Sequence, residues 1–318
     1  MDSFLNTESN KFQRTDWGLN NVDRITILYV LLTTLLLILG SDQYENITQH
    51  YLTRLVMLLF IWLIIWLGKE FPGRVTYLFH HLYPLIFLSY FFPETDYLNN
   101  IFMTDLDPGI IRLELSIFGI MPSEVFSSYC SQAWFSELMH LGYFSFYLII
   151  TFFVGYYYIK LPELAEKRVF IFFLSFYLFY LIFIFSPSAG PQYFLPASDS
   201  NVPKGYLFTD IMKEILLYGD KPTGAFPSSH IGMTWLMMYF FFVDNRKVFL
   251  WWLIPALVLT FSTVYIKAHY AVDVLAGFLI VPLFIWLGDK VYNWFLEYYT
   301  STVRQSTKTK TTTFLPFK

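Results

Sequence analysis

The chain has 318 residues, of which 56% are hydrophobic, 22% aromatic and only 14% charged, and its mean hydropathy is +0.48. Soluble domains carry about 25% charged residues, so this composition excludes an ordinary soluble globular domain. The formal net charge of −3 argues against a nucleic-acid partner, and the single cysteine, Cys130, excludes an internal disulfide framework.

Apolar runs recur along the chain, with lengths close to the about 20 residues that an α-helix needs to cross a bilayer. They lie at 25–40, 53–68, 76–93, 135–159, 169–186, 229–244, 248–266 and 270–289. We therefore expect an all-α, polytopic membrane helix bundle with about eight spans. No small-residue cleavage site follows the first run, so we expect it to be retained as a span.

The pattern predicts three parts: residues 1–75 with two accessory spans, a six-span core at 76–289, and a Ser/Thr/Lys-rich tail at 290–318 that we expect to be disordered. If both ends are cytoplasmic, most Lys and Arg residues lie on the cytoplasmic side, as the positive-inside rule requires. Two long segments, about 94–134 and 187–228, then lie outside. We expect a bacterial cytoplasmic membrane with an external site; a secretory-pathway membrane with a luminal site has the same topology.

Two histidines stand at the starts of predicted spans. His230 begins one span and His269 another, and the two spans between them are joined by a tight turn at 244–247. A helical hairpin returns the chain to the face it left, so both histidines are expected at the external face. Ionisable groups at such positions are functional candidates. The alternative is that each is an interfacial residue bonded to backbone carbonyls.

Each histidine has polar neighbours that suit catalysis. Asp273 follows His269 by four residues, which would place its carboxylate on the same helix face, where it could accept Nδ1–H and leave Nε2 free as a nucleophile. Ser228 and Ser229 precede the span that begins near His230. Serine is a preferred N-cap, and the free N–H groups of a helix start suit a phosphate.

The order GAFPSSH (224–230) and then STVYIKAHYAVDVLAG (262–277), with the turn PSAGPQY (187–193) one span upstream, resembles the type-2 phosphatidic acid phosphatase superfamily. The resemblance covers about residues 76–289. It implies that His269 is the nucleophile that forms a phosphohistidine, oriented by Asp273. His230 would be the general acid, and the region of Ser228 and Ser229 would hold phosphate oxygens. The implied substrate is a lipid phosphate, with no cofactor and no metal.

The chain departs from the pattern of that superfamily in its basic residues. The first motif has no Lys and no Arg-Pro, and Gln192 stands where a basic residue would follow Gly-Pro. In the third motif Thr263 replaces an arginine, and in the second Ser229 replaces a glycine. Lys267 and Lys221 are the candidate substitutes for the missing phosphate-binding charges. The pattern around Lys267 is similar to that of the inositol phosphorylceramide synthase-like branch.

Other polar residues are expected to be mainly structural. His80 and His81 would be interfacial rather than a metal pair, and Glu137 and His140 either line the cavity or cap a helix. The acidic residues Asp105, Asp107 and Glu114 would belong to a solvated loop.

Three functions remain open from the sequence. The first is a membrane phosphatase that hydrolyses a lipid phosphate ester or diphosphate. The second is a phosphotransferase that moves a phospho-head group between a lipid and an alcohol such as inositol or ceramide. The third is a non-catalytic lipid-binding or transport protein, which the missing arginines would favour.

Overall fold

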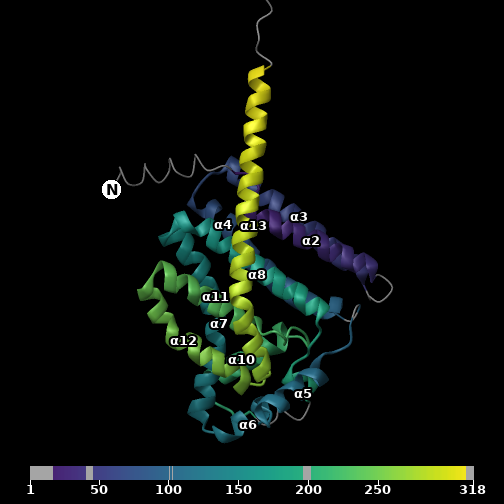
Figure 1. Cartoon of the computed structure of the whole chain (residues 1–318), viewed down its shortest axis with the longest axis vertical. Helices are drawn as coiled ribbons and strands as arrows, with labels where there is room; N and C mark the ends of the chain where they lie inside the picture. The colour runs from purple at the N-terminus through teal and green to yellow at the C-terminus, as the bar shows by residue number, and fades with distance from the viewer. Residues whose placement is uncertain (1–16, 41–45, 100, 102, 196–201, 313–318) are drawn as a thin grey trace, which may run out of the picture.

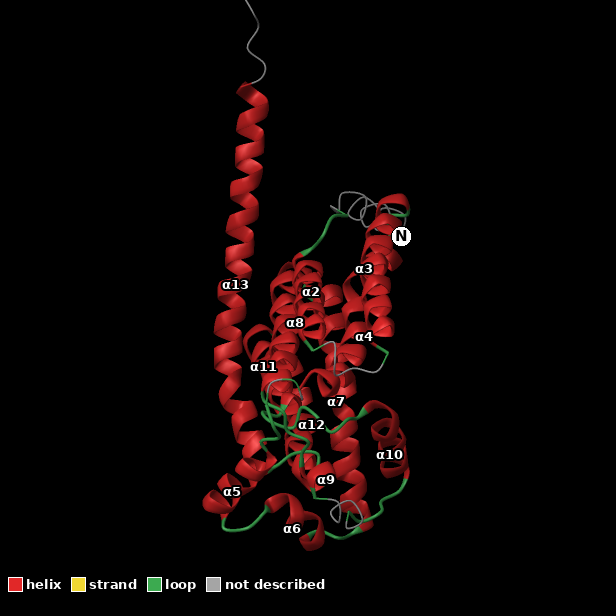
Figure 2. Cartoon of the chain, turned by 90° about the vertical axis from the view of Figure 1, so that its right-hand side faces the viewer, coloured by secondary structure: helices red, strands yellow, loops and turns green. Residues whose placement is uncertain are grey.

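The computed structural model describes residues 17–40, 46–99, 101, 103–195 and 202–312, and every regular element within these ranges is a helix. Long helices form a bundle with shorter helices at one end (Figures 1 and 2). The long helices are α2 (Asn21–Leu39), α3 (Ile47–Glu70), α4 (Arg74–Asn99), α7 (Ala133–Lys160), α8 (Pro162–Phe185), α11 (Ser229–Asp244), α12 (Arg246–Tyr265) and α13 (Ala271–Thr312). The shorter helices are α5 (Asp107–Phe118), α6 (Pro122–Tyr129), α9 (Pro191–Phe194) and α10 (Leu207–Gly219).

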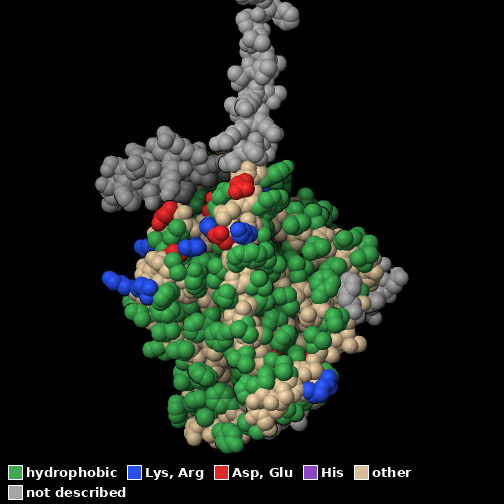
Figure 3. Space-filling model, viewed as in Figure 1, with side chains coloured by type: hydrophobic (Ala, Val, Ile, Leu, Met, Phe, Trp, Pro, Cys, Tyr) green, Lys and Arg blue, Asp and Glu red, His purple; other side chains and the backbone are tan. Residues whose placement is uncertain are grey.

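Seven of the described helices are long and apolar enough to cross a membrane, which confirms a multi-pass helical membrane protein. They are α2, α3, α4, α7, α8, α12 and the first part of α13. The remaining expected span is α11, which has 16 residues and packs against α7, α8, α12 and α13. On the face seen in Figure 3, hydrophobic side chains cover the middle of the bundle, and charged side chains gather toward the end from which α13 projects.

Local signals in the sequence explain where several helices begin. Asn20 and Asp23 form a capping box at the start of α2, because each side chain accepts a hydrogen bond from the other's backbone N–H, at 2.9 and 2.8 Å. Asn245 Oδ1 accepts from the N–H of Lys247 at 3.1 Å and so caps α12. Within lipid, a helix satisfies the backbone groups of its interior, so only those at its ends need capping partners.

The C-terminal part of the chain differs from the expected disordered tail. α13 continues as a helix to Thr312, and residues 313–318 lie outside the described residues. The physical reason is that a helix already nucleated in the packed bundle can extend at one hydrogen bond per added residue, without a new nucleation cost.

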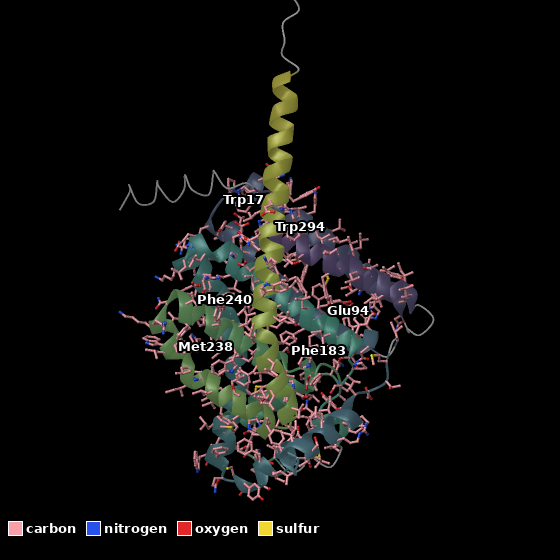
Figure 4. All side chains as sticks on the ribbon, in the orientation of Figure 1. Trp17, Glu94, Phe183, Met238, Phe240 and Trp294 are labelled. Atoms are coloured by element: carbon pink, nitrogen blue, oxygen red, sulfur yellow. The ribbon has the colours of Figure 1, made fainter. Side chains whose placement is uncertain are left out.

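Helix α8 lies at the centre of the bundle, because α2, α4, α7, α11 and α13 all pack against it. Nine of its 24 residues are phenylalanine or tyrosine, and their side chains pack with those of the neighbouring helices. In Figure 4, Phe183 on α8 and Met238 and Phe240 on α11 lie within the bundle, whereas Trp17 and Trp294 lie toward the end away from α5 and α6.

Ionisable groups inside the bundle are paired. Arg54 on α3 and Glu94 on α4 form a buried ion pair with an N–O distance of 2.7 Å. His80 Nε2 lies 2.8 Å from a carboxylate oxygen of Asp23, and only 3% of His80 is exposed. The partner of His80 is distant in the sequence, and burial is tolerated because the two polar groups satisfy each other.

Candidate active site

Three segments meet where the long helices end near α9 and α10. They are the first segment (187–194), the second segment (220–230) and the third segment (262–273). Main-chain hydrogen bonds of 3.1 Å join them in pairs: Ala225 N–H to Ser188 O, Gln192 N–H to Lys267 O, and Ser228 N–H to Asp273 O. The site is thus assembled on a backbone framework, and the two histidines of the second and third segments are held in register.

Gly190 is the point at which all three segments touch. Its φ of +86° is unfavourable for residues with a side chain, and a Cβ at this position would lie 3.0 Å from both Ala225 Cβ and the Ala268 oxygen. Glycine is therefore required for the close approach of the first segment to the other two.

The two candidate histidines are in direct contact. His230 Nδ1 lies 3.1 Å from His269 Nε2, and His269 Nδ1 lies 2.8 Å from the main-chain oxygen of Ala225. A carbonyl oxygen can only accept, so in neutral His269 the proton is on Nδ1 and Nε2 carries the lone pair. His230 Nδ1–H must then donate to that lone pair. This arrangement presents a nucleophilic nitrogen with a proton donor beside it.

His269 is held in its neutral form by its surroundings. Only 3% of the residue is exposed, and burial lowers the pKa of its imidazole to about 4; the Ala225 carbonyl and the nearby Asp220 carboxyl offset part of this effect. At neutral pH the ring is therefore uncharged, which is the state a nucleophile requires.

Asp273 is placed differently from the expectation that it accepts Nδ1–H of His269. Its Oδ2 lies 3.6 Å from Nδ1 and accepts a hydrogen bond of 2.8 Å from the N–H of Tyr270. The reason is that α13 begins only at Ala271, so the spacing of four residues does not lie within one helix. Asp273 instead closes the first turn of α13, while its carboxyl group remains near the His269 ring.

The start of α11 has the predicted form. Ser228 is the N-cap, and its Oγ accepts from the N–H of Ile231 at 3.4 Å. Ser229 is the first residue of the helix and, like His230, lines a cavity. The first N–H groups of a helix have no partner within it and favour an anion. A Cβ at Gly277 would lie 2.6 Å from the Ser228 oxygen, so this glycine lets α13 approach the start of α11.

Lys267 and Lys221, the candidate substitutes for the missing charges, and Gln192, which stands where a basic residue was expected, each have an acidic neighbour. Lys267 is fully buried, has a φ of +65°, and places Nζ 3.5 Å from Glu124 Oε1. Gln192 Nε2 donates a hydrogen bond to Asp220. Lys221 interacts electrostatically with Asp96 at the end of α4.

Acidic residues expected in a solvated loop are instead buried beside the site. Asp107 accepts hydrogen bonds from the N–H groups of Ala189 and Gly190, at 2.8 and 2.9 Å, and from the Tyr270 hydroxyl at 2.9 Å. It thereby ties the first segment to the third. Glu114 accepts from the N–H of Val272 at 3.2 Å, at the start of α13.

The burial of Asp107 and Glu114 corrects the loop expectation, since neither is measurably exposed, whereas Asp105 is exposed. The physical reason is that the free N–H groups of the first segment and of the α13 start need acceptors, and α5 supplies them. The sequence could have indicated a helix here, because the carboxylates lie in a stretch that also contains Ile110, Leu113 and Leu115. This mixture of apolar and acidic residues is typical of an amphipathic helix.

Glu137 and His140 serve as structural groups. Glu137 accepts from the N–H groups of Tyr206 and Phe208, at 2.6 and 2.7 Å, and so caps the start of α10. His140 Nδ1 lies 2.7 Å from the Ser136 oxygen one helical turn earlier. Of the two alternatives, the capping role is the one found.

A cavity of about 350 Å³ adjoins His230. Asp220, Ser229 and His230 line it together with aliphatic and aromatic side chains of α4, α7, α8 and α10. The apolar lining includes Leu85, Leu88, Phe92, Phe146, Ile150 and Phe176. The rings of Tyr143 and Phe146 also pack against the His230 imidazole, with centroid distances of 4.7 and 4.4 Å. A hydrocarbon chain with a polar head at the histidines would match this lining.

Within the described residues, no cluster of three His, Cys, Asp or Glu side chains could hold a metal ion. The family model described as the PAP2 superfamily matches residues 108–287, from α5 into α13. The match contains all three segments and leaves α2, α3 and α4 outside. Comparisons with curated proteins and with solved structures find no match.

Proposed function

Because the chain belongs to the PAP2 superfamily, we propose that it is an integral-membrane phosphatase that hydrolyses a lipid phosphate ester or diphosphate through a phosphohistidine. Membership indicates a phosphatase-type lipid phosphoesterase in general terms. The observation that carries the specific proposal is the contact of His269 Nε2 with His230 Nδ1, with the His269 tautomer set by the Ala225 carbonyl.

In the first half of the proposed reaction, His269 Nε2 attacks phosphorus and the bond from phosphorus to the leaving oxygen breaks. His230, 3.1 Å away, protonates that oxygen as it departs. Substrate binding separates the two rings, because the phosphoryl group must lie between the attacking nitrogen and the leaving oxygen. Asp273, close to Nδ1 but not its hydrogen-bond acceptor, stabilises the positive charge that develops on the phosphorylated ring.

We propose that the phosphoryl oxygens bind at the start of α11, on the free N–H groups and the hydroxyl of Ser229, while Ser228 holds that helix start in place. Lys267, Lys221 and Gln192 remain proposed contributors to the same site. Lys267 is the strongest of them, since it is buried, lies two residues from His269, and has no hydrogen-bond partner at Nζ among the described residues. Its partial pairing with Glu124 leaves it able to attract a dianion.

The apolar cavity supports a lipid as the substrate. A head group at the histidines leaves its hydrocarbon chain beside the lining of α4 and α7. We place the site at the external or luminal face, with both ends of the chain in the cytoplasm, because this orientation agrees with the distribution of Lys and Arg. A bacterial cytoplasmic membrane is the proposed location.

The test uses the purified chain in detergent micelles and a panel of phosphatidic acid, lysophosphatidic acid and an isoprenyl diphosphate. Release of inorganic phosphate from these lipids is measured. His269→Ala should abolish release, whereas His50→Gln, a histidine substitution in α3 away from the three segments, should leave it unchanged. If no lipid on the panel yields phosphate, or if His269→Ala remains active, the proposal is wrong and a lipid-binding or transport role is favoured.

Phosphoryl transfer to an alcohol is the second candidate, and the polar group that Asp220 and Gln192 form beside His230 favours it, since a carboxylate and an amide suit a hydroxyl ligand. Both candidates share the first half-reaction. Incubation of a labelled lipid phosphate with and without inositol or ceramide separates them: a labelled alcohol phosphate indicates transfer, and labelled inorganic phosphate alone indicates hydrolysis.

A further inference from the structure

Asp220 is an acidic residue beside the histidine pair to which neither the motifs nor the proposed first half-reaction gives a role. It follows the last turn of α10 and lines the same cavity as Ser229 and His230. Its carboxyl group lowers the cost of protonating the His269 ring and so raises the pKa of that ring, against the larger effect of burial. The residue is half-buried and lines the cavity, so a molecule in the cavity can contact it.

The carboxyl group is held in a defined orientation. Gln192 Nε2 donates a hydrogen bond to Oδ2, and the Tyr193 side chain also bonds to the carboxyl. The backbone N–H of Gln192 is in turn bonded to the Lys267 oxygen at 3.1 Å, so the orientation is fixed to the third segment, which carries His269. The Lys221 backbone N–H is a third donor to this carboxyl, and since a carboxylate accepts about four hydrogen bonds, one acceptor position remains for a ligand.

We propose that Asp220 is the catalytic base of the second half-reaction, which takes the proton from the water or alcohol that attacks the phosphohistidine. The inference rests on the proposed function. In a double displacement, the second nucleophile enters from the side that the leaving group has vacated, opposite His269. That side is the cavity shared by His230 and Asp220, so the entering oxygen passes the carboxylate.

The entering oxygen bonds to phosphorus, the bond between phosphorus and His269 Nε2 breaks, and its electron pair returns to Nε2. The proton of the entering oxygen goes to Asp220, which later gives it to His230, and His230 is then ready to protonate the next leaving group. Burial raises the pKa of Asp220 to about 6, which suits a group that must accept and return a proton near neutral pH.

Exchange of ¹⁸O between labelled inorganic phosphate and water tests the second half-reaction without any lipid, because phosphate must form and lose the phosphohistidine. The shift of the phosphorus resonance in nuclear magnetic resonance spectra measures the exchange. We expect exchange by the wild-type chain in micelles, none by His269→Ala, and a decrease of at least about 100-fold for Asp220→Asn. Glu214→Gln, an exposed substitution on α10, is the matched control and should exchange at the wild-type rate.

A rapid-quench experiment with ³²P-phosphatidic acid, or with the most active lipid of the panel, measures the first half-reaction in the same variants. Asp220→Asn should release close to one equivalent of the lipid alcohol in a burst and accumulate ³²P-labelled protein, because the first half-reaction is intact. The burst also shows that the variant is folded. Conversely, His230→Asn should lose the burst and retain at least about tenfold more ¹⁸O exchange than Asp220→Asn.

Several results would overturn the role of Asp220. Wild-type exchange by Asp220→Asn would show that the carboxylate is not needed, and loss of both burst and exchange would make it structural. Equal loss of exchange in His230→Asn and Asp220→Asn would assign both proton transfers to His230. If the wild-type chain neither exchanges ¹⁸O nor becomes labelled, the proposed phosphohistidine itself fails, which is a distinguishable outcome.

Discussion

The Nδ1 atom of His269 lies 2.8 Å from the main-chain oxygen of Ala225, which accepts its hydrogen bond. The Asp273 carboxylate was expected in that position, but it is 3.6 Å away and accepts from a backbone N–H. The tautomer of the proposed nucleophile is therefore set by the main chain of the second segment, and no side-chain substitution removes this acceptor.

Asp273→Asn should accordingly lower kcat much less than removal of the nucleophile in His269→Ala does. Asparagine can still accept from the Tyr270 N–H, so the turn at the start of α13 is retained, and only an ionisable group near His269 is lost. We expect kcat to fall about tenfold, equivalent to about 1.4 kcal/mol in the activation free energy. Phosphate release at saturating lipid measures this change; a loss as complete as that in His269→Ala would contradict it.

Asp107→Ala should destabilise the protein strongly. Asp107 is fully buried, and its removal would leave two backbone N–H groups and the Tyr270 hydroxyl without their acceptor. The expected loss is about 3 kcal/mol in the free energy of unfolding. Thermal unfolding in micelles measures it, with the exposed Asp105→Ala as the matched control. Equal unfolding temperatures for the two variants would show that Asp107 does not hold the segments together.

The two half-reactions should respond differently to acid. His269, with a pKa lowered to about 4, stays neutral as the pH falls from 7 to 5, so it can still attack. Asp220, with a pKa raised to about 6, becomes protonated over the same range and cannot accept a proton. We expect phosphorylated protein to accumulate at pH 5 but not at pH 7.5, in labelling reactions stopped with alkaline detergent because phosphohistidine hydrolyses in acid, and Asp220→Asn to accumulate it at both. Equal labelling of the wild-type chain at both values would contradict the assignment.

Substitutions in the pair of Lys267 and Glu124 can separate the effect of the Lys267 charge on activity from its effect on stability. Glu124→Gln removes the partner of a buried lysine and should cost about 1–2 kcal/mol, less than for a fully buried pair because 32% of the Glu124 side chain is exposed. The double variant Lys267→Met with Glu124→Gln should recover most of that loss in thermal unfolding. Its phosphate release should stay low if Lys267 attracts the phosphoryl group; recovered activity would leave Lys267 a purely structural role.

The sequence predicted the features that depend on local pattern. Apolar run length indicated the bundle, the hairpin between His230 and His269 placed both at one end of it, and serine before an apolar run indicated the N-cap of α11. These inferences need only neighbouring residues and the length of a helix.

The features that were missed depend on partners distant in the chain. Asp107 bonds to Tyr270, 163 residues later, and His80 bonds to Asp23, 57 residues earlier. A single sequence carries no signal for which buried carboxylate meets which donor. The position of Asp273 was misjudged for a different reason: the helical spacing was applied across the turn at 266–270, where Lys267 has a positive φ.

The hydrogen bonds that join the three segments run between main-chain atoms, which every residue type possesses. Substitutions can therefore change the side chains around the histidine pair without breaking these main-chain hydrogen bonds. Gln192 and Thr263, which stand where the resemblance led us to expect basic residues, are examples. The main-chain framework and the side chains that contact the head group can therefore change independently. A lineage carrying this framework can change the molecule it acts on by few substitutions, and comparison of such lineages at positions 192, 220 and 263 would trace that change.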